Sequence, residues 1–407
     1  MLTYEEALGR IQQAVPAPRR QRVGLEEAFG LVLAESIKAP CNLPRFDNSA
    51  VDGYAMFAVS HEERVSNGEP LSALPVVGTA EAGRPFDGVV EPGRAVRIFT
   101  GAAVPAGANA VVMQEYVTTR NEEIILDRWP RIGQNIRRRG EDVRRGRMIL
   151  DAGARVRPEE IGLLAALGIQ RVQVFRRPRV SILATGNELH AAGTRLKPGQ
   201  LYDSNGAMLA ALVRQAGATP QPLGAVPDDL ELLAQEIRRG LTADVLVCSG
   251  GISVGDKDLG RQALQRCGVT RLFWQVNIKP GMPVWFGQRG RTLVFGLPGN
   301  PVSAFVTFEE FVAPALARLM GQGWRDPYTL PARLAADLPV SGSRRTQFVR
   351  VAVKGDNGTT QVTPLPDQGS HQLRSLAAAD GWIRVTANGR HALRSGSPVF
   401  VKSGASR

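Results

Sequence analysis

Hydrophobic positions recur at helical spacing near the amino terminus. Leu8, Ile11 and Val15 lie on one helical face, and a second apolar stripe follows in LEEAFGLVLAESI (residues 25–37). The proline-rich segment VPAPRR separates the two stripes. The pattern predicts helices within residues 3–38, interrupted at these prolines.

The pattern changes between about residues 40 and 151. Short β-branched runs such as LPVVG, AVRIF and EEIIL alternate with glycine and proline, which predicts a small β-rich domain. The segment RPEEIGLLAALG then predicts a helix, because Pro158 stands in its first turn and Gly168 follows its last turn.

From about residue 177 to residue 323, apolar strands alternate with helical stretches such as GAMLAALVRQAG and DLELLAQEIRRG. This alternation predicts a doubly wound α/β domain. The alternating pattern of QFVRVAV predicts a small β domain at the end of the chain.

Composition narrows the class of protein. The 407 residues, 43% hydrophobic and 22% charged, suit about two to four globular domains. No apolar run reaches the roughly 18 residues of a membrane-spanning helix, and MLTYEEALGR does not have the charge pattern of a secretion signal. We therefore expect a cytoplasmic protein without membrane contact.

Cysteine, histidine and net charge exclude several kinds of site. The 3 cysteines form no CxxC pair and the 4 histidines no HExxH motif, which argues against disulfides and against zinc. A net charge of +12 suits nucleic acid, an acidic membrane or anionic substrates, but we favour an arginine-biased coding preference as its cause. The segment RRRGEDVRRGR lacks interleaved aromatic residues, so we expect no nucleic acid partner.

Four predicted strands end in polar or glycine-rich loops. VSILA continues into TGNEL, a second strand ends before Asp228, VLVC continues into SGGISVGDKD, and TLVFG continues into LPGNPVS. Doubly wound sheets bind ligands outside the carboxyl ends of their strands. We therefore expect these loops to line one rim.

The loop SGGISVGDKD has the composition of an anion site. Its glycines let backbone N–H groups converge, Ser249 and Ser253 add hydroxyl donors, and Asp256 and Asp258 suit a phosphate bound together with Mg²⁺. A glycine turn capped by aspartates is the alternative. The segment GLPGNPVSAF, with Pro301 at a helix start, is a second candidate anion site or a plain strand-to-helix connection.

Other candidates lie outside these loops. Lys279 stands beside a Pro-Gly turn in NIKPGMPV, where it could face a substrate oxyanion. FDNSAVDGYAMF and RRGEDV place acids next to glycine and are either site segments or solvated turns.

Together these segments resemble a known family. FDNSAVDGYA, TGAAVPAGANAVVMQE, NIRRRGEDV, TGNEL, SGGISVGDKD, IKPG and GLPGNPVSAFVTFEEFV are similar, in order, to the motifs of the molybdopterin molybdenumtransferases, which include bacterial MoeA and the gephyrin E domain. The resemblance covers nearly the whole chain. It implies an elongated homodimer whose subunits have four domains.

The resemblance also implies the domain boundaries. It implies a helical and mixed amino-terminal domain from residues 1–44 and 138–176, with a β-rich domain inserted at residues 45–137. An α/β molybdopterin-binding domain then covers residues 177–324, and a small β-barrel covers residues 325–407.

The implied activity is a transferase reaction in molybdenum cofactor biosynthesis. Molybdate and adenylylated molybdopterin give molybdenum cofactor and AMP, with Mg²⁺ required. The dithiolene sulfurs of the substrate receive the metal, so the enzyme needs no cysteine cluster. The preceding adenylyltransferase and downstream cofactor-maturation proteins are the implied partners.

The resemblance carries roles to individual positions. Glu188 and Asp258 are the leading Mg²⁺ ligands, and Lys279 is the leading cation for the oxyanion. Asp52 and Asp142 are implied to reach the site from the second subunit. The remaining implied site residues are Asp228, an acid of the rim; Arg350 and Ser370 for the oxyanion; Thr100, Ser249 and Ser303 for phosphate; and Gly250, Gly251, Ser253, Gly255, Pro298, Asn300 and Pro301 for the pterin nucleotide.

The chain departs from the family pattern at three positions. Asn187 replaces an acid common among relatives, and Gln275 and Met282 stand where lysines are frequent. Losing two cations weakens the attraction for molybdate. Two alternatives stay open: a molybdopterin adenylyltransferase, because the α/β domain also resembles that enzyme, and a scaffold similar to gephyrin.

Overall fold

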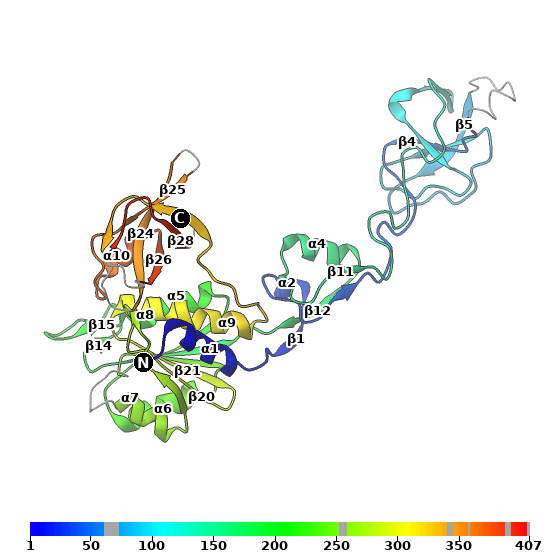
Figure 1. The fold of residues 1–407 in the computed structure, drawn as a ribbon. Helices are drawn as coiled ribbons and strands as arrows, with labels where there is room; N and C mark the ends of the chain where they lie inside the picture. Colours follow the sequence, from blue (N-terminus) through cyan, green and yellow to red (C-terminus); the bar gives the residue numbers. More distant parts are fainter. Residues whose placement is uncertain (61–72, 252–258, 340–344, 357–358, 387–391, 405–407) are drawn as a thin grey trace. The chain divides into compact units, whose positions relative to one another are not determined.

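The computed structural model describes residues 1–60, 73–251, 259–339, 345–356, 359–386 and 392–404. The chain divides into two compact units (Figure 1). Unit 1 comprises Met1–Gln21, Gly30–Ala34 and Gln173–Arg407, and unit 2 comprises Arg22–Phe29 and Glu35–Val172. Within the described residues, no helix is long and apolar enough to cross a membrane.

Unit 2 is built around one six-stranded sheet. Its strand order is β7-β4-β6-β5-β9-β8. Apolar side chains fill both of its faces: Ala55, Val96 and Val111 belong to one cluster, and Tyr54 and Val112 to the other. The strands are β4 (Gly53–Met56), β5 (Leu74–Ala80), β6 (Ala95–Ile98), β7 (Ala110–Met113), β8 (Val117–Arg120) and β9 (Glu123–Leu126).

The rest of unit 2 consists of short elements. Helix α4 (Pro158–Ala166) begins at the predicted proline, and Gly168 follows it with a positive φ of 76°. The other elements are α2 (Leu25–Ala28), η1 (Gln114–Tyr116), β2 (Ile37–Lys38), β3 (Asn48–Ser49), β10 (Ile136–Arg137) and β11 (Met148–Leu150).

The predicted second helix within residues 25–38 is wrong beyond Ala28. Gly30 has a positive φ of 75°, and residues 31–34 form a fully buried apolar run that bonds to a strand. The Phe175 N–H donates to the Val32 carbonyl at 2.9 Å, and the Ala34 N–H donates to Gln173 at 2.8 Å. A short apolar run buried on all sides has no periodicity that distinguishes helix from strand.

The core of unit 1 is a six-stranded sheet with the order β16-β13-β17-β21-β20-β18. The first four strands are parallel, and β20 and β18 add an antiparallel edge. The strands are β13 (Arg179–Thr185), β16 (Thr219–Val226), β17 (Val245–Ser249), β18 (Thr270–Trp274), β20 (Trp285–Arg289) and β21 (Thr292–Leu297).

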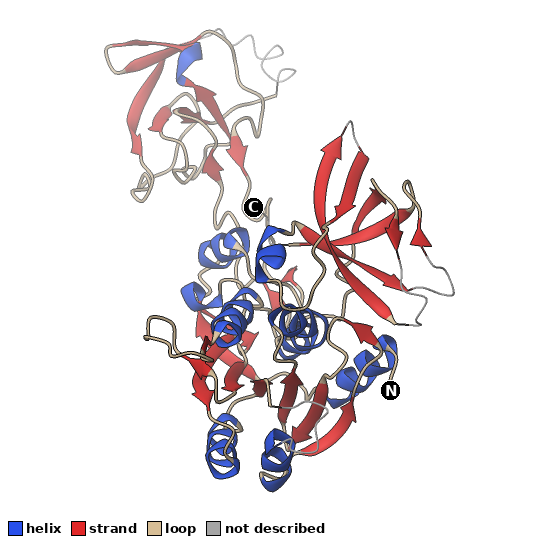
Figure 2. Cartoon of the chain, turned by 90° about the vertical axis from the view of Figure 1, so that its left-hand side faces the viewer, coloured by secondary structure: helices blue, strands red, loops and turns tan. Residues whose placement is uncertain are grey.

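Helices cover both faces of this sheet (Figure 2). Val245 and Val247 of β17 face the layer that contains α1, α5, α8 and α9, whereas Leu246 and Cys248 face α6 and α7. This alternation is the pattern of a sheet buried on both sides. The helices are α1 (Tyr4–Ala14), α5 (Ser204–Gln215), α6 (Leu230–Gly240), α7 (Leu259–Arg266), α8 (Pro301–Thr307) and α9 (Ala313–Leu319), with the π-helical turn η2 (Phe308–Val312) between the last two.

A closed barrel follows in the same unit. Strands β24, β25, β22, β28 and β26 pair in this order, and β26 pairs back to β24, while β19 extends from β24. The elements are β19 (Ile278–Lys279), β22 (Leu330–Leu334), β24 (Thr346–Asp356), β25 (Thr359–Pro364), α10 (Leu373–Ala378), β26 (Gly381–Thr386) and β28 (Pro398–Ser403), with a short pair β23 (Leu338–Pro339) and β27 (Ala392–Leu393).

One buried carboxylate joins distant parts of unit 1. Glu310 of η2 accepts hydrogen bonds from the Tyr4 hydroxyl at 2.6 Å, the Tyr328 hydroxyl at 3.0 Å and the Lys402 ammonium at 3.1 Å. Burial, followed by the negative charge of Glu310, raises the pKa of both tyrosines. The carboxylate therefore bonds to α1, to the segment before the barrel and to the barrel's last strand.

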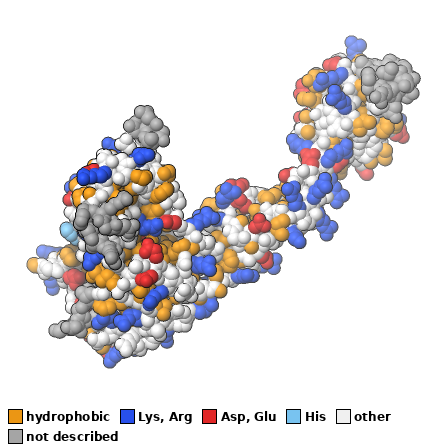
Figure 3. Space-filling view, viewed as in Figure 1, with side chains coloured by type: hydrophobic (Ala, Val, Ile, Leu, Met, Phe, Trp, Pro, Cys, Tyr) orange, Lys and Arg blue, Asp and Glu red, His pale blue; other side chains and the backbone are white. Residues whose placement is uncertain are grey.

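Basic side chains are dispersed over the molecule. In the space-filling view, lysine and arginine side chains are spread over the visible face of each unit and alternate with acidic ones (Figure 3).

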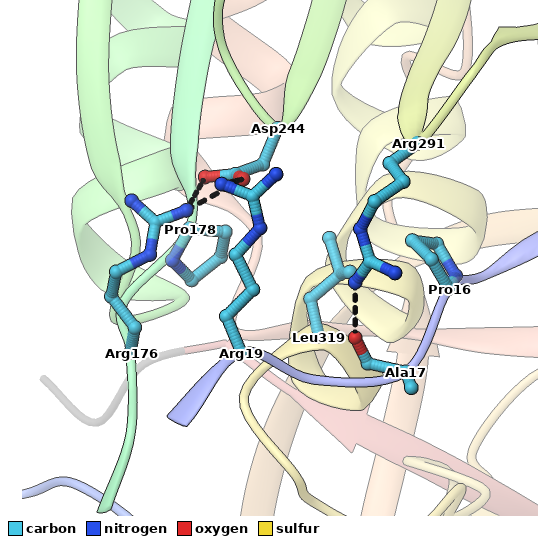
Figure 4. Close-up of a pocket in the computed structure, with 8 residues that line it drawn as sticks. All are labelled: Pro16, Ala17, Arg19, Arg176, Pro178, Asp244, Arg291 and Leu319. Carbon is cyan, nitrogen blue, oxygen red and sulfur yellow. Dashed lines mark hydrogen bonds and ion pairs between the residues drawn. The ribbon is translucent and has the colours of Figure 1, made fainter. Parts of the chain in front are cut away.

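The amino-terminal edge of the central sheet carries a compact arginine cluster around Asp244 (Figure 4). Arg176 donates to both Asp244 oxygens at 2.6 and 2.8 Å, and the Arg179 N–H donates to the same carboxylate at 2.8 Å. Arg19 lies 3.8 Å from it, and Arg291 donates to the Ala17 carbonyl at 2.6 Å. The space between these side chains is about 20 Å³, which holds no more than a water molecule.

Candidate functional site

A large cavity opens at the opposite edge of the same sheet. Its volume is about 860 Å³, and the ends of β13, β17 and β21 and the loop after β16 form its walls. The strand order reverses between β13 and β17, which is where doubly wound sheets bind ligands. The predicted site residues that line it are Glu188, Asp228, Ser249, Gly250, Gly251, Pro298, Asn300 and Pro301.

The glycines after β17 permit a close approach to β13. Gly250 and Gly251 have positive φ angles of 82° and 59°. A Cβ on Gly250 would lie 2.6 Å from the Thr185 carbonyl oxygen, and one on Gly251 would lie 2.2 Å from Thr185 Oγ1. Only glycine fits these positions without displacement. Thr185 Oγ1 is itself buried, with no hydrogen-bond partner in the described part of the chain.

The start of α5 connects two of the loops. Asp203 caps the helix by accepting from the Gly206 N–H at 2.8 Å. Asn205 donates from Nδ2 to Ser249 Oγ at 2.9 Å and to the Gly299 carbonyl at 2.7 Å. Its Oδ1 is buried, and no partner for it occurs among the described residues. Asn205 thus lines the cavity and keeps a buried acceptor without a partner in the described structure.

Two carboxylates share the cavity. The Glu188 side chain folds back over Gly186, where a Cβ would lie 2.7 Å from both carboxylate oxygens. The Asp228 N–H donates to Asn187 Oδ1 at 3.0 Å. Asn187, which replaces the acid of the family pattern, therefore anchors the loop after β16. Burial, and then the negative charge of Glu188, raise the pKa of Asp228. This pair of acids would be stabilised by a positive ion.

A second cavity, of about 540 Å³, adjoins the first at Pro283, which lines both. Lys279 and Arg345 bring two positive charges to it, and the predicted residues Ser303 and Ser370 bring hydroxyl groups. Met282 lines the same cavity. Because many relatives have a lysine at this position, the second cavity of this chain has one positive charge fewer than theirs.

Arg350 bonds to Gly369, which lines the second cavity. It is only 2% exposed and donates to the carbonyls of Asp367 and Gly369 at 2.6 and 3.2 Å and to Ser375 Oγ at 3.1 Å. Burial lowers the pKa of its guanidinium. In the described structure, Arg350 therefore orients the loop that carries Ser370.

Three predicted residues belong to unit 2. Asp52 accepts from the Thr100 N–H and from Thr100 Oγ1, each at 2.7 Å, and the backbone bond is the main reason that the pKa of Asp52 is lowered. Asp142 is exposed, and its N–H donates to Leu43 at 3.2 Å. Within unit 2, Asp52 and Thr100 form one hydrogen-bonded pair.

The predicted residues Ser253, Gly255 and Asp258, and Asp256 with them, lie outside the described residues. The Mg²⁺ pair of Glu188 and Asp258 therefore stays a prediction. Within the described residues, no group of three or more histidine, cysteine, aspartate or glutamate side chains has the arrangement of a metal site.

The sequence reasoning missed several lining residues of the first cavity. Thr185, Tyr202, Asp203, Asn205 and His371 all line it. The segment DSN before the apolar periodicity of GAMLAALV is a helix start signal that could have indicated Asp203 and Asn205. His371 comes from the barrel part of the chain, and no local pattern connects it to the rim.

Comparison with family models divides the chain into three matches. Residues 2–168 match the MoeA N-terminal region (domain I and II), residues 181–318 match a probable molybdopterin binding domain, and residues 331–402 match the MoeA C-terminal region (domain IV).

Full-length relatives and solved structures agree with these family matches. The chain is 36% identical to the molybdopterin molybdenumtransferase of Haemophilus influenzae over 99% of this chain and 98% of the relative. It is 35% identical to that of Bacillus subtilis over 98% and 93% of the two chains. A crystal structure of a molybdopterin biosynthesis MoeA protein from Pyrococcus horikoshii matches with a TM-score of 0.84 at 32% identity, covering 100% of both chains.

Proposed function

Because this chain belongs to the molybdopterin molybdenumtransferase family, we propose that it inserts molybdenum into adenylylated molybdopterin and releases AMP. The observation that carries the proposal is the pair of adjoining cavities. One has the size and acids for a pterin nucleotide with its diphosphate, and the other has the cations for an oxyanion.

The first cavity suits the substrate's diphosphate. Glycines free the backbone at residues 250 and 251, and the hydroxyl of Ser249 is oriented by Asn205. In the reaction water hydrolyses the phosphoanhydride bond, which gives AMP and the pterin phosphate. The two dithiolene thiols bond to molybdenum, and their two protons leave with one molybdate oxygen as water. The protein contributes mainly orientation and charge stabilisation.

Glu188 and Asp228 fit a magnesium ion. Both supply carboxylate oxygens to one cavity, and burial, followed by the negative charge of Glu188, raises the pKa of Asp228. When bound, Mg²⁺ would neutralise diphosphate charge and favour departure of AMP. The predicted ligand Asp258 would complete the set.

Lys279 is the proposed contact for molybdate. Its ammonium and the hydroxyls of Ser303 and Ser370 line the second cavity, and Arg350 positions the loop of Ser370 through the Gly369 carbonyl. Arg345 adds a second positive charge beside Lys279. This charge partly replaces the cation that Met282 removes from the family pattern.

The remaining expectations belong to the same proposal. In a homodimer, the second subunit would supply Asp52, Asp142 and Thr100 to the site. The enzyme would work in the cytoplasm and exchange intermediates with the preceding adenylyltransferase and with downstream maturation proteins.

The test is AMP release by the full-length chain supplied with adenylylated molybdopterin, Mg²⁺ and molybdate. We expect release to depend on both ions. Lys279→Met should raise the molybdate KM by about tenfold or more, since one direct charge contact is lost. Lys354→Met, which changes an exposed barrel lysine, is the matched control.

Two outcomes would contradict the proposal. Wild-type protein that releases no AMP under any of these conditions would exclude the reaction. ATP consumption with unmodified molybdopterin would instead identify an adenylyltransferase.

A further inference from the structure

A short arm of the chain projects at the mouth of the first cavity. We define the arm as residues 189–202, in which β14 (Leu189–His190) pairs in parallel with β15 (Leu201–Tyr202) (Figure 1). The arm is joined to the rim at its base, where the Leu201 N–H donates to the Glu188 carbonyl at 2.7 Å and the Asp203 N–H donates to His190 at 2.8 Å.

The arm presents apolar side chains to the cavity. Leu189, Leu201 and Tyr202 line it, although Leu201 is 59% and Tyr202 47% exposed. The Tyr202 hydroxyl donates to the Thr194 carbonyl at 2.8 Å, which fixes the ring on the arm. An aromatic ring held in place at the mouth of a polar cavity is suited to stacking on a flat ligand.

The charges of the two cavities indicate which part of the substrate lies here. The substrate has a diphosphate at its centre, with the dithiolene-bearing pterin on one side and adenosine on the other. The dithiolene must reach the oxyanion, so it belongs toward Pro283 and the Lys279 cavity. Glu188 and Asp228, at the base of the arm, suit the metal-bound diphosphate, which leaves the arm for adenosine.

The cavity also offers hydrogen-bond partners for a nucleoside. Ribose hydroxyls and the adenine amino group are donors that need acceptors. Asn205 and Thr185 line the same cavity, and Asn205 Oδ1 and Thr185 Oγ1 are buried without a partner among the described residues. Buried polar atoms in proteins are nearly always hydrogen-bonded, so two buried atoms without a partner beside one cavity agree with a ligand bound there.

We propose that Tyr202, supported by Leu201, stacks on the adenine ring of the substrate and so positions its nucleotide half. The proposal rests on the proposed function, since it assigns one part of that substrate to one side chain. It makes Tyr202 a determinant of nucleotide affinity, separate from the residues that contact phosphate.

The experiment compares two ligands that differ only by the base. AMP and ribose 5-phosphate are titrated calorimetrically, with Mg²⁺, into wild-type protein and the Tyr202→Phe and Tyr202→Ala variants. We expect Tyr202→Ala to weaken AMP about tenfold, as loss of one base stack does, and to leave ribose 5-phosphate unchanged. Tyr202→Phe keeps the ring and should bind AMP nearly as the wild type does.

A matched control is Phe400→Ala, which removes an aromatic side chain that is 59% exposed on β28 and outside this cavity. It should alter the affinity for neither ligand.

Three outcomes would overturn the assignment. They are an equal loss of affinity for both ligands in Tyr202→Ala, no measurable AMP binding by the wild type, or an unchanged AMP affinity of Tyr202→Ala with a raised KM for adenylylated molybdopterin. The last would place the ring at the pterin.

The AMP release assay separates this inference from the proposed function. A wild-type protein that binds AMP in a Tyr202-dependent manner but never releases AMP from adenylylated molybdopterin would refute the transferase and support the stacking site.

Discussion

The two edges of the central sheet differ in whether their carboxylates have positively charged partners within the described part of the protein. At the amino-terminal edge, Asp244 accepts two bonds from Arg176 and one from the Arg179 N–H, and little space remains. At the carboxyl-terminal edge, Glu188 and Asp228 face a cavity of about 860 Å³, and the pKa of Asp228 is raised. The same strands supply both edges.

This difference indicates which carboxylates stabilise the fold and which bind a ligand. A carboxylate whose partners are all in the protein contributes to the fold, and removing it leaves charges without partners. A carboxylate whose charge is not compensated costs stability, so its presence points to a ligand. This contrast gives predictions in which activity and stability respond differently at the two edges.

The largest effect is expected for Glu188→Gln. Losing the carboxylate should reduce kcat/KM for AMP release about 100-fold or more, because a metal-binding charge disappears while the side chain keeps its size. Thermal unfolding should be unchanged or slightly improved, since Asp228 loses a negative neighbour. Glu231→Gln, on exposed α6 surface, is the control; full magnesium-dependent activity in Glu188→Gln would remove Glu188 from the proposed site.

The reverse response is expected for Asp244→Ala. The side chain is 13% exposed, and its loss leaves Arg176 and the Arg179 N–H without their acceptor. Unfolding free energy should fall by about 2–4 kcal/mol in urea titration, with kcat at 25 °C nearly unchanged. Asp337→Ala removes an exposed pair with Arg394 and should lower the unfolding free energy much less than Asp244→Ala does, because solvent screens an exposed ion pair. Equal costs for the two variants would contradict this interpretation of the edge.

The smallest effect is expected for Asp228→Asn. Because the pKa of Asp228 in the fold lies above its ordinary value of 3.8, the folded state holds this proton more tightly, and stability falls as pH rises through that range. The variant should therefore be more stable than wild type at neutral pH, by less than about 1 kcal/mol because solvent screens the group, with the difference vanishing at low pH. Calorimetry across pH measures this.

Magnesium should favour the stability of the wild type over that of Asp228→Asn. Adding Mg²⁺ at neutral pH should raise the melting temperature of the wild type more than that of Asp228→Asn. A stability gain from Mg²⁺ that is the same in both proteins would separate Asp228 from the metal.

Family, fold class and function could be predicted from the sequence, and the comparisons confirm all three. Family and function follow from the resemblance of seven ordered motifs. The α/β fold and its shared rim follow from local patterns, since each strand that ends in a glycine-rich loop carries its own signal and parallel strands bring such ends to one edge. The structure accordingly places Glu188, Asp228 and Ser249 around one cavity. The roles of these residues stay predictions.

Features that depend on distant partners could not be predicted. The run at residues 31–34 bonds to a strand near residue 174. Because all four residues are buried, the run has no polar and apolar alternation that would distinguish a strand from a helix. Asn205 acquires its role only because α5 begins beside the ends of β17 and β21. The family resemblance assigns Arg350 to the oxyanion, which stays a prediction, and its bonds to the carbonyls of Asp367 and Gly369 could not be predicted from the sequence.

The carboxylate of Glu310 has a consequence for how this chain can be divided. It binds a tyrosine from the first helix, a tyrosine just before the barrel and a lysine from the last strand. A fragment ending near residue 325 would retain the acid but lose two of these three donors, leaving an anion in an apolar interior. We therefore expect truncation at that boundary to destabilise the α/β part of unit 1, and we expect the first and last segments of unit 1 to unfold together.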